Sequence, residues 1–435
     1  MNESLLLKEK ERLQGWKGPK VSGKVTHVIG LLIESTGPEV SLGELCEVYG
    51  KDLRKIPCQV VGFKEEKVLL MALGDMTTIA PGSEVYPTGD IPKVFVSDSL
   101  CGRVVNAFGE PIDGKGALEG GQFYPISAAP PSPLTRGRIS EILPTGIKAI
   151  DSLITLGKGQ RIGIFAGPGG GKSTLLAMIA KMTTADVNVI ALIGERGREV
   201  REFIEMELGP QGLAKSVVVV VTSDEPAPLR SKGASVATAI AEYFRDQGKD
   251  VVLMMDSISR YAMAEREVGL AIGEPPTIKG YPPSVFAHLP KLVERAGKSD
   301  RGSITGIYTI LTEEDDPSDP IADQVRSLLD GHIVLSKKLV QKTHFPPIDV
   351  LASLSRVMKN ITSSEQQMLG NKLRALLHTY FEAEDLIHIG AYVKGSNARI
   401  DEAMNKIDTL THFLRQQSHE AFGWHETLEL LEKSV

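Results

Sequence analysis

The sequence predicts an α/β protein built from three parts: a small β-barrel, a parallel sheet wrapped by helices, and a C-terminal helical domain. Three observations support this fold class. Short β-rich runs separated by glycine- and proline-containing turns recur over residues 21–93. Strand-like and helix-like patterns alternate over residues 94–358. Over residues 359–435 the apolar residues follow helical spacing.

Each part can be assigned elements from its residues. Residues 1–20 are charged and leucine-containing, and predict a short N-terminal arm. The barrel region carries strand-like runs at residues 23–30, 44–49, 58–63 and 67–72. The central region carries candidate strands at residues 161–165, 188–193, 216–221, 251–255 and 304–311, with a helical period at 234–246. The proline-rich stretch at 128–135 predicts an extended connector, and helices are predicted at 365–381, 397–407 and 412–421.

The composition narrows the class of function. The chain has 435 residues, of which 42% are hydrophobic and 24% charged, as in soluble globular proteins with more than one domain. A net charge of −6 and an aromatic content of 5% argue against nucleic acid as the main partner, because binding it needs a basic face and stacking platforms. The three cysteines, Cys46, Cys58 and Cys101, fit no metal pattern or even disulfide set, which indicates free thiols in a reducing compartment.

No targeting segment is predicted. Charges begin too early in the chain for a signal peptide. No apolar run approaches the roughly 18 residues that a membrane span needs. We therefore expect a cytoplasmic protein.

The strongest motif is Ala-Gly-Pro-Gly-Gly-Gly-Lys-Ser at residues 166–173, between an apolar strand and a helix. Glycines let consecutive backbone N–H groups turn toward phosphate oxygens, and the helix start adds its positive dipole end. Lys172 would reach the β- and γ-phosphates, and Ser173 would hold Mg²⁺. The alternative is a flexible glycine-rich turn. The predicted nucleotide-binding residues here are Gly167, Pro168, Gly169, Gly170, Gly171, Lys172, Ser173 and Thr174.

Hydrolysis needs more than a phosphate loop: a metal ligand, a base for the water, and positive charge at the γ-phosphate. Asp256 ends an apolar strand, so its carboxylate would lie beside the loop and hold the metal shell. Glu195 follows another strand and is the candidate base. Glu199 could bind metal-bound water, or it could be a surface acid paired with Arg196 or Arg198.

Several arginines could supply the positive charge. Arg196, Arg198 and Arg201 follow Glu195 closely, and Arg260 lies four residues after Asp256. Any one of them taken alone is more typical of a protein surface than of a catalytic site.

These residues stand in stretches that resemble the hexameric ATPases of flagellar and type III secretion export systems, which are relatives of the rotary ATP synthase α and β subunits. The resemblance extends over nearly all of residues 20–435. The stretches that carry it are 194–203, 255–267, 273–286, 289–297, 347–356 and 385–395. It implies a P-loop core of the RecA-like type, preceded by a small β-barrel that holds a ring together.

The resemblance also implies roles that spacing does not. Glu195 matches the catalytic glutamate, Arg196 its neighbour at the phosphates, and Arg260 the γ-phosphate arginine. Arg356 matches the arginine finger that reaches into the neighbouring subunit's site, and Phe345 the aromatic residue that stacks on adenine. For Phe345, a core or domain-seam phenylalanine is the alternative.

As a member of this family the chain is expected to form a homohexamer that hydrolyses ATP with Mg²⁺. The hydrolysis would be coupled to chaperone release, unfolding and export of secreted proteins. The implied partners are a central stalk protein, a stator or regulator of the export apparatus, the export-gate membrane proteins and chaperone–substrate complexes, with no nucleic acid. The implied location is the cytoplasm, peripherally associated with the inner membrane through the apparatus.

Three other functions stay open on the sequence. A catalytic subunit of a rotary ATP synthase would take its finger from a different chain. A ring helicase or RNA translocase shares a related core, although the acidic composition argues against it. A structural ring subunit without activity conflicts with the joint presence of Lys172, Glu195, Asp256 and Arg356.

Overall fold

The computed structural model describes residues 21–312 and 319–435. The arm predicted for residues 1–20 lies outside the described residues. The chain divides into two compact units. One unit contains the described residues up to Pro92 together with Glu267–Pro275, and the other contains Lys93–Arg266 and Pro276–Val435. The predicted fold class is confirmed: a six-stranded barrel, a mainly parallel sheet with helices, and a C-terminal set of helices.

The first unit is a closed barrel with strand order β1-β2-β5-β4-β3-β6. Along β2 and β3 buried side chains alternate with partly exposed ones, as in a small barrel with a filled interior. Cys46 and Cys58 are opposite each other in register as free thiols, and burial raises the pKa of both. The strands are β1 (Gly23–Ile29), β2 (Leu32–Thr36), β3 (Leu45–Tyr49), β4 (Lys55–Lys64), β5 (Lys67–Ala72) and β6 (Glu84–Pro87).

The second unit is organised around a sheet with strand order β17-β16-β10-β15-β13-β11-β12-β8, with β14 pairing beside β15. The five strands predicted for this region are β10, β11, β12, β13 and β15, and all five run parallel. They are almost continuously apolar because both faces of a parallel sheet are covered. The bounds are β8 (Arg103–Val105), β10 (Arg161–Ala166), β11 (Val187–Glu195), β12 (Ser216–Thr222), β13 (Asp250–Asp256), β14 (Gly297–Lys298), β15 (Ser303–Leu311), β16 (Gly331–Leu335) and β17 (Ile348–Ser355).

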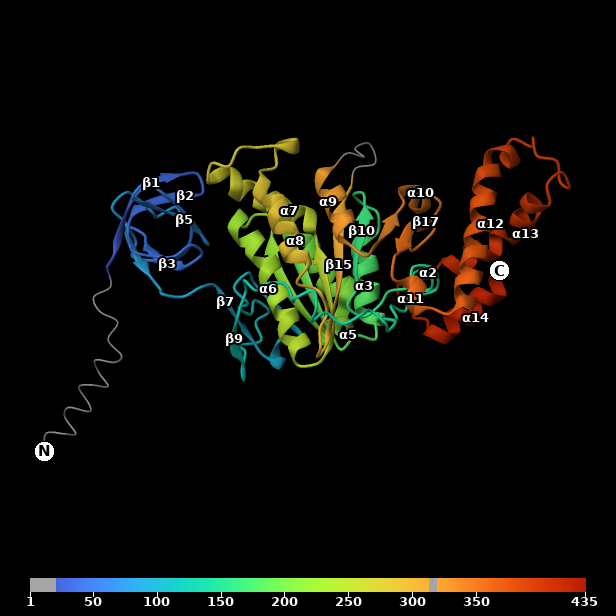
Figure 1. Cartoon of the computed structure of the whole chain (residues 1–435), viewed down its shortest axis with the longest axis horizontal. Coiled ribbons are helices and arrows are strands. Elements are labelled where there is room, and N and C mark those ends of the chain that lie inside the picture. Colours follow the sequence, from blue (N-terminus) through green and yellow to red (C-terminus); the bar gives the residue numbers. More distant parts are fainter. Residues whose placement is uncertain (1–20, 313–318) are drawn as a thin grey trace, which may run out of the picture. The chain divides into compact units, whose positions relative to one another are not determined.

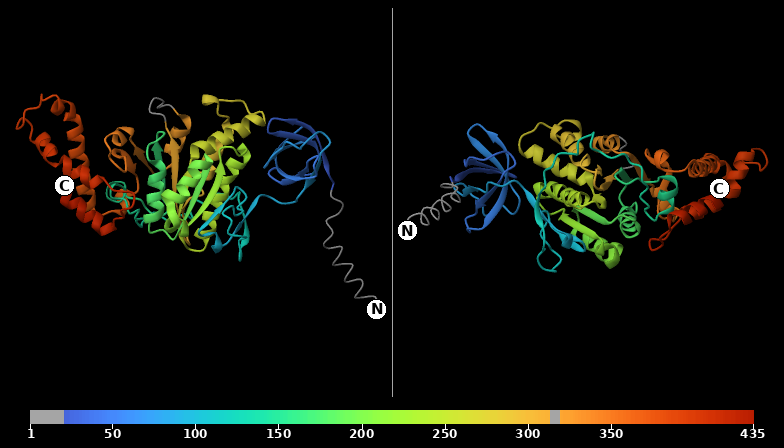
Figure 2. Two further views of the ribbon diagram at one scale, coloured as in Figure 1. Left: turned by 180° about the vertical axis from the view of Figure 1, so that it is seen from behind. Right: turned by 60° about the horizontal axis from the view of Figure 1, so that its bottom comes forward.

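Helices pack on both faces of this sheet, as the views in Figure 1 and Figure 2 show. The longest of them in the core, α6, packs along β11 and β13. A separate two-stranded sheet pairs β7 (Lys93–Val96) with β9 (Gln122–Pro125). The core helices are α2 (Lys148–Leu153), α3 (Lys172–Met182), α4 (Gly197–Glu202), α5 (Gly209–Ala214), α6 (Ala227–Asp246), α7 (Ile258–Ala271), α8 (Pro283–Val293), α9 (Pro320–Leu328), α10 (Lys337–Gln341) and α11 (Met358–Ile361), with short 3₁₀ turns η1 (Asp98–Leu100) and η3 (Ile278–Gly280) and a π-helical segment η2 (Phe203–Leu208).

The C-terminal region consists of α12 (Ser364–His388), α13 (Ala398–Leu414) and α14 (Trp424–Ser434), with α12 and α13 side by side in Figure 1. Two predicted helices are confirmed, but the helix predicted at 412–421 is wrong. Helix α13 ends at Leu414 because hydrogen bonds to distant residues hold the next segment in an extended conformation. Buried Gln416 accepts from Lys148 N at 2.9 Å and donates to Gly146 O at 2.8 Å, while its own N–H donates to Phe345 O at 2.9 Å.

In the described ranges, 21–312 and 319–435, no helix combines the length and the apolar character needed to cross a membrane.

Candidate active site

Three strands of the parallel sheet end beside one another and carry the predicted residues. β10 runs into the glycine loop, β11 ends at Glu195, and β13 ends at Asp256. Because the strands are parallel, their carboxyl ends meet at one edge of the sheet, where proteins of this architecture bind ligands. The topology therefore brings together Lys172, Glu195 and Asp256, which lie 23, 61 and 84 residues apart in the sequence.

The glycine loop has a backbone that only glycine adopts easily. Gly169 and Gly171 have φ of +73° and +78°, in the left-handed region that disfavours a Cβ. Gly170 N donates to Gly167 O at 3.1 Å and closes the turn. A Cβ on Gly167 would lie 2.8 Å from Cε of Lys337, so the lysine side chain packs closely over this glycine. The helix α3 then begins at Lys172, so its first N–H groups open toward the loop.

The ammonium of Lys172 lies between two carboxylates. Its Nζ is 2.5 Å from Oδ1 of Asp256 and 3.6 Å from Oε1 of Glu195. The hydroxyl of Thr309, on β15, donates to the same Asp256 oxygen at 2.9 Å. All of these side chains are largely buried, so the lysine offsets the repulsion between two closely spaced acids.

Glu195 is the last residue of β11 and is only 8% exposed. Arg260, on α7, donates Nε and Nη2 to its two oxygens at 3.1 and 3.4 Å, which fixes the orientation of the carboxylate. Burial, and then the charge of Asp256, raise the pKa of Glu195, while Lys172 and Arg260 oppose that shift. A raised pKa is typical of a carboxylate that exchanges protons at a functional site.

A glycine makes room for this arginine. Gly194 has φ of +70°, and a Cβ there would lie 2.9 Å from Cδ of Arg260. The Gly194–Glu195 pair thus lets the strand end turn while the arginine packs across it.

The arginines on α4 behave as surface residues in this chain. Arg196 donates to Glu199 at 3.2 Å, and both are exposed. Arg198 and Arg201 make the same kind of pair with Glu202 and Glu205, one helical turn further on. The alternative interpretation of Glu199, a surface acid paired with a neighbouring arginine, is therefore the geometry found, and Arg260 is the arginine that the fold brings to Glu195.

Arg356 lies at the other edge of the sheet. It follows β17, which is antiparallel to β16, so Ser355 is paired with Gly331 at the start of that strand. The end of β16, Leu335, is instead paired with Ala166 beside the glycine loop. Arg356 is exposed. Within one chain it therefore lies at the end of the sheet opposite to the phosphate loop.

Phe345 is close in sequence to Pro347, which contacts the glycine loop. A Cβ on Gly171 would meet Cγ of Pro347 at 3.4 Å, so the 345–347 segment packs on the start of α3. Phe345 itself is 47% exposed, with its carbonyl held by Gln416. An exposed aromatic ring anchored beside a phosphate loop suits a flat base.

The oxygen donors at this edge fit a hard divalent cation. Ser173, in the first turn of α3, is exposed, and Asp256 carries a carboxylate that Thr309 orients. Across the described part of the chain there is no group of three histidine, cysteine or acidic residues arranged to hold a metal. A magnesium ion here would therefore take most of its shell from phosphate oxygens and water, as is usual for this ion.

Three contacts escaped the sequence analysis: Thr309 on Asp256, Lys337 on Gly167, and Pro347 on Gly171. The sequence did not single out Thr309, because β15, which neighbours the Asp256 strand, also contains Ser303, Thr305 and Tyr308. The contacts of Lys337 and Pro347 depend on the path of the chain between β16 and β17, which no local sequence pattern predicts.

Comparison with known proteins agrees with this geometry. Residues 146–355 match the nucleotide-binding domain of the ATP synthase alpha/beta family, residues 25–89 match the beta-barrel domain of that family, and residues 362–433 match the T3SS EscN ATPase C-terminal domain.

Two relatives illustrate the similarity in sequence. The chain is 55% identical to the flagellum-specific ATP synthase of Bacillus subtilis, over 94% of each chain. It is 50% identical to the type 3 secretion system ATPase of Xanthomonas euvesicatoria, over 94% of this chain and 93% of the relative.

Solved structures show the same likeness in three dimensions. The assembled ATPase EscN of the enteropathogenic E. coli type III secretion system superposes with a TM-score of 0.90 at 45% identity, covering 95% of this chain and 99% of EscN. The assembled EscN in complex with its central stalk EscO superposes with a TM-score of 0.88 at 44% identity, with the same coverage.

Proposed function

The chain belongs to the family of flagellar and type III secretion ATPases, and we propose that it hydrolyses ATP as a ring of identical subunits to drive the export of proteins through such an apparatus. The observation that carries the proposal is the cluster of Lys172, Glu195, Asp256 and Arg260 beside the glycine loop. The membership supports ATP as the substrate.

In this proposal the glycine loop binds the phosphates. The N–H groups of residues 167–174, other than that of Pro168, which has none, surround the phosphate chain, and Lys172 neutralises the β- and γ-phosphates. Phe345 stacks on adenine. Ser173 and Asp256 would hold Mg²⁺, which when bound would neutralise charge on the phosphates.

Glu195 orients the attacking water and accepts its proton. Its raised pKa brings the carboxylate closer to the pH at which a base works efficiently. The two hydrogen bonds from Arg260 hold it at a fixed angle, and the charge of Arg260 lies at the same edge as the γ-phosphate. Arg196 and Glu199 pair with each other at the start of α4, which supports a role for both at the rim of the site rather than on the reacting atoms.

The site becomes complete only between subunits. The exposed Arg356, at the opposite edge of the sheet, would reach the γ-phosphate of the adjacent subunit. An arginine supplied in this way is worth about 10³–10⁵ in rate. The assembled state of EscN supports a ring for this chain, and the EscN–EscO complex supports a central stalk protein as its partner.

The remaining partners follow from the family. We propose that the ring acts on chaperone–substrate complexes, releasing and unfolding the cargo for the export-gate membrane proteins, with a stator or regulator of the apparatus bound to it. It would work from the cytoplasm, peripherally associated with the inner membrane through the apparatus. The relatives include both flagellar and type III secretion proteins, and the proposal covers either apparatus.

Phosphate release by the purified chain, measured with Mg²⁺-ATP over a wide range of protein concentration, tests the proposal. We expect specific activity to climb steeply as rings assemble. Activity that stays at zero after ring formation has been verified by light scattering would show that the finger comes from another chain, as in a rotary synthase. Activity independent of concentration from a monomer would overturn the composite site.

A further inference from the structure

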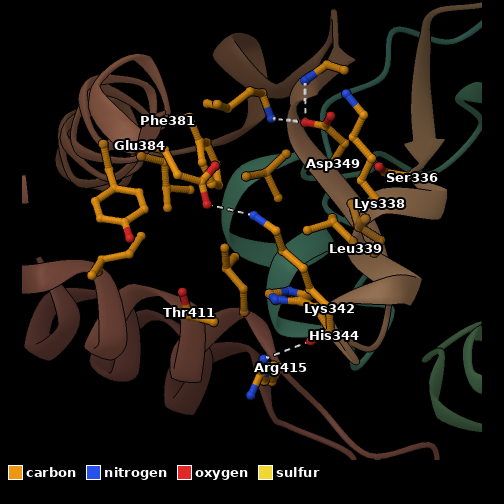
Figure 3. Close-up of a pocket in the computed structure, with 18 of the residues that line it drawn as sticks. Ser336, Lys338, Leu339, Lys342, His344, Asp349, Phe381, Glu384, Thr411 and Arg415 are labelled. Carbon is orange, nitrogen blue, oxygen red and sulfur yellow. Dashed lines mark hydrogen bonds and ion pairs between the residues drawn. The ribbon is translucent and has the colours of Figure 1, made fainter. Parts of the chain in front are cut away.

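A cavity of about 720 Å³ lies between the C-terminal helices and the segment that follows β16 (Figure 3). One wall is formed by α10 and the start of β17, and the other by the facing sides of α12 and α13. Its volume falls within the range of small-molecule sites, about 300–1,000 Å³. No part of the proposed ATP chemistry uses it.

The cavity combines an apolar floor with cations. Leu339, Tyr380 and Phe381 belong to that floor, and Phe381 is 42% exposed. Figure 3 shows Lys342 extended across the space to Glu384, at 2.8 Å, so these two charges satisfy each other.

The other charged side chains that line the cavity differ in how far partners compensate their charge. Asp349 has backbone partners, because its Oδ1 accepts from the N–H groups of Leu351 and Ala352 at 3.0 Å. Lys338 has no ion-pair partner among the described residues, and the guanidinium of Arg415 has only a long bond of 3.4 Å to Lys342 O. Asp408 is the one lining carboxylate left to oppose them.

A buried imidazole also lines the cavity without a partner. His344 is 6% exposed, and its ring nitrogens make no hydrogen bond to any residue that the structure describes. Burial, and then the nearby Arg415, lower the pKa of His344 to about 4, so at neutral pH the ring is uncharged and offers one N–H donor and one acceptor. A buried polar group usually has a hydrogen-bond partner, which here would have to be supplied from within the cavity.

The wall of the cavity is continuous with the phosphate loop. Lys337, the first residue of α10, packs against Gly167, and the next residue, Lys338, lines the cavity. At the other end of this segment, Pro347 packs against Gly171 and the next residue, Ile348, lines the cavity. A molecule that braces this segment therefore also braces both ends of the glycine loop.

We propose that this cavity is a regulatory site for a small organic anion with a ring-sized apolar body, and that its occupancy is coupled to nucleotide binding at the glycine loop. The apolar body packs on Tyr380 and Phe381, and the anionic group is bound by Arg415 and Lys338, with a hydrogen bond from His344. The coupling rests on the proposed role of the glycine loop, whereas the cavity site itself does not. Since coupling is reciprocal, nucleotide at the loop must change the affinity of the cavity by the same factor as the anion changes that of the loop.

Anilinonaphthalenesulfonate, an aromatic sulfonate, is the probe for the test, with binding followed by fluorescence and its stoichiometry by equilibrium dialysis on the full chain. We expect one saturable site per chain. Arg415→Gln and Lys338→Gln should each weaken binding about tenfold, the effect of one hydrogen bond to a charged group. Ala352→Trp, at an exposed lining position, should block the cavity.

Matched controls lie on the same part of the fold but outside the cavity. Lys406→Gln on α13 and Ala391→Trp in the loop after α12 should bind the probe like the parent chain. If the Arg415 and Lys338 variants and the blocked variant all bind the probe as the parent does, the cavity is not the site. Circular dichroism confirms that each variant is folded, and the glutamine variants keep the test valid if Ala352→Trp does not fold.

The coupling is tested with a non-hydrolysable ATP analogue. At saturation it should shift the dissociation constant of the probe in the parent chain and leave it unchanged in Lys172→Ala. No shift in the parent, with binding of the analogue verified directly, would refute the coupling while the proposed function stands. A shift that persists in Lys172→Ala would count against the assigned nucleotide site and not against the cavity.

Discussion

Replacing Arg356 by alanine tests the geometry on which the composite site depends. The side chain is exposed, and the backbone at this position is held by the N–H of Arg356 donating to Asp330 O at 2.9 Å, so the substitution should leave the fold intact. Gly331, paired with the residue before Arg356, and Leu335, beside the start of the glycine loop, are four residues apart on β16. At about 3.3 Å per residue this is roughly 13 Å along the strand, before the loop itself is reached. We therefore expect Arg356 to act on a nucleotide held by the adjacent chain rather than by its own.

Two measurements follow. Purified Arg356→Ala should bind ATP as the parent does, and its turnover should fall by about 10³–10⁵. Mixed in equal amounts with Lys172→Ala and reassembled, it should regain activity, because a site works when its loop comes from one variant and its finger from the other. For random assembly with independent sites, about a quarter of the sites meet both conditions, so up to about a quarter of parental phosphate release should return.

The double variant with both substitutions is the control, since mixing it with either single variant restores no complete site. Recovery that is absent, although mixed rings are shown by mass spectrometry of differently labelled chains, would refute the trans role of Arg356. Unchanged turnover of Arg356→Ala alone would refute any catalytic role for it.

Three further outcomes are expected at the same site. Lys172→Ala should abolish ATP binding in equilibrium dialysis, whereas Glu195→Gln should bind ATP and lose about 10²–10⁴ in turnover, as removal of a general base does; parental turnover of Glu195→Gln would reject it as the base. Activity should fall as the pH drops through the pKa of Glu195, which burial places above its usual 4.5, and Arg260→Gln should move this acidic limb to higher pH because Arg260 opposes the upward shift; a limb that stays in place or moves down contradicts the assignment. Phe345→Ala should raise KM for ATP by the factor that corresponds to the loss of a stacking free energy of about 1–3 kcal/mol, with kcat unchanged. Phe345→Tyr should behave like the parent. A lowered melting temperature without a change in KM would favour the domain-seam alternative.

Much of the fold was predictable because its elements are locally consistent. The strands β11, β12 and β15 are long and rich in β-branched residues, so their type and position follow from the sequence pattern. The glycine loop was predictable for the same reason, because its left-handed glycines and the start of α3 are consecutive in the sequence. The prediction of a helix at 412–421 was wrong because the backbone conformation around Gln416 is determined by hydrogen bonds to Gly146 and Phe345, which are distant in the sequence.

The candidate site divides in the same way. Glu195 and Asp256 were predictable as strand ends, and parallel strands bring their ends together. The roles of Arg196, Arg198 and Arg201 were not, since local charge density cannot distinguish an arginine on an exposed helix from one that reaches a buried carboxylate. In the fold it is Arg260, which the family resemblance also assigns, that contacts Glu195, across 65 residues of sequence.

The direction of one strand is the reason why we propose that this site depends on assembly. β16 runs parallel to β10 and ends at the glycine loop, and the chain then returns antiparallel along β17. Had β17 been parallel as well, Arg356 would follow it at the same edge as Lys172, and one chain could hold every charge that hydrolysis needs. The reversal places the arginine at the opposite end of the sheet, while the turn before β17 brings Pro347 against Gly171 of the loop. The residues proposed to bind nucleotide and the arginine proposed to trigger its hydrolysis thus lie at opposite ends of the sheet, so we expect a single chain to bind ATP but to hydrolyse it rapidly only beside a second copy.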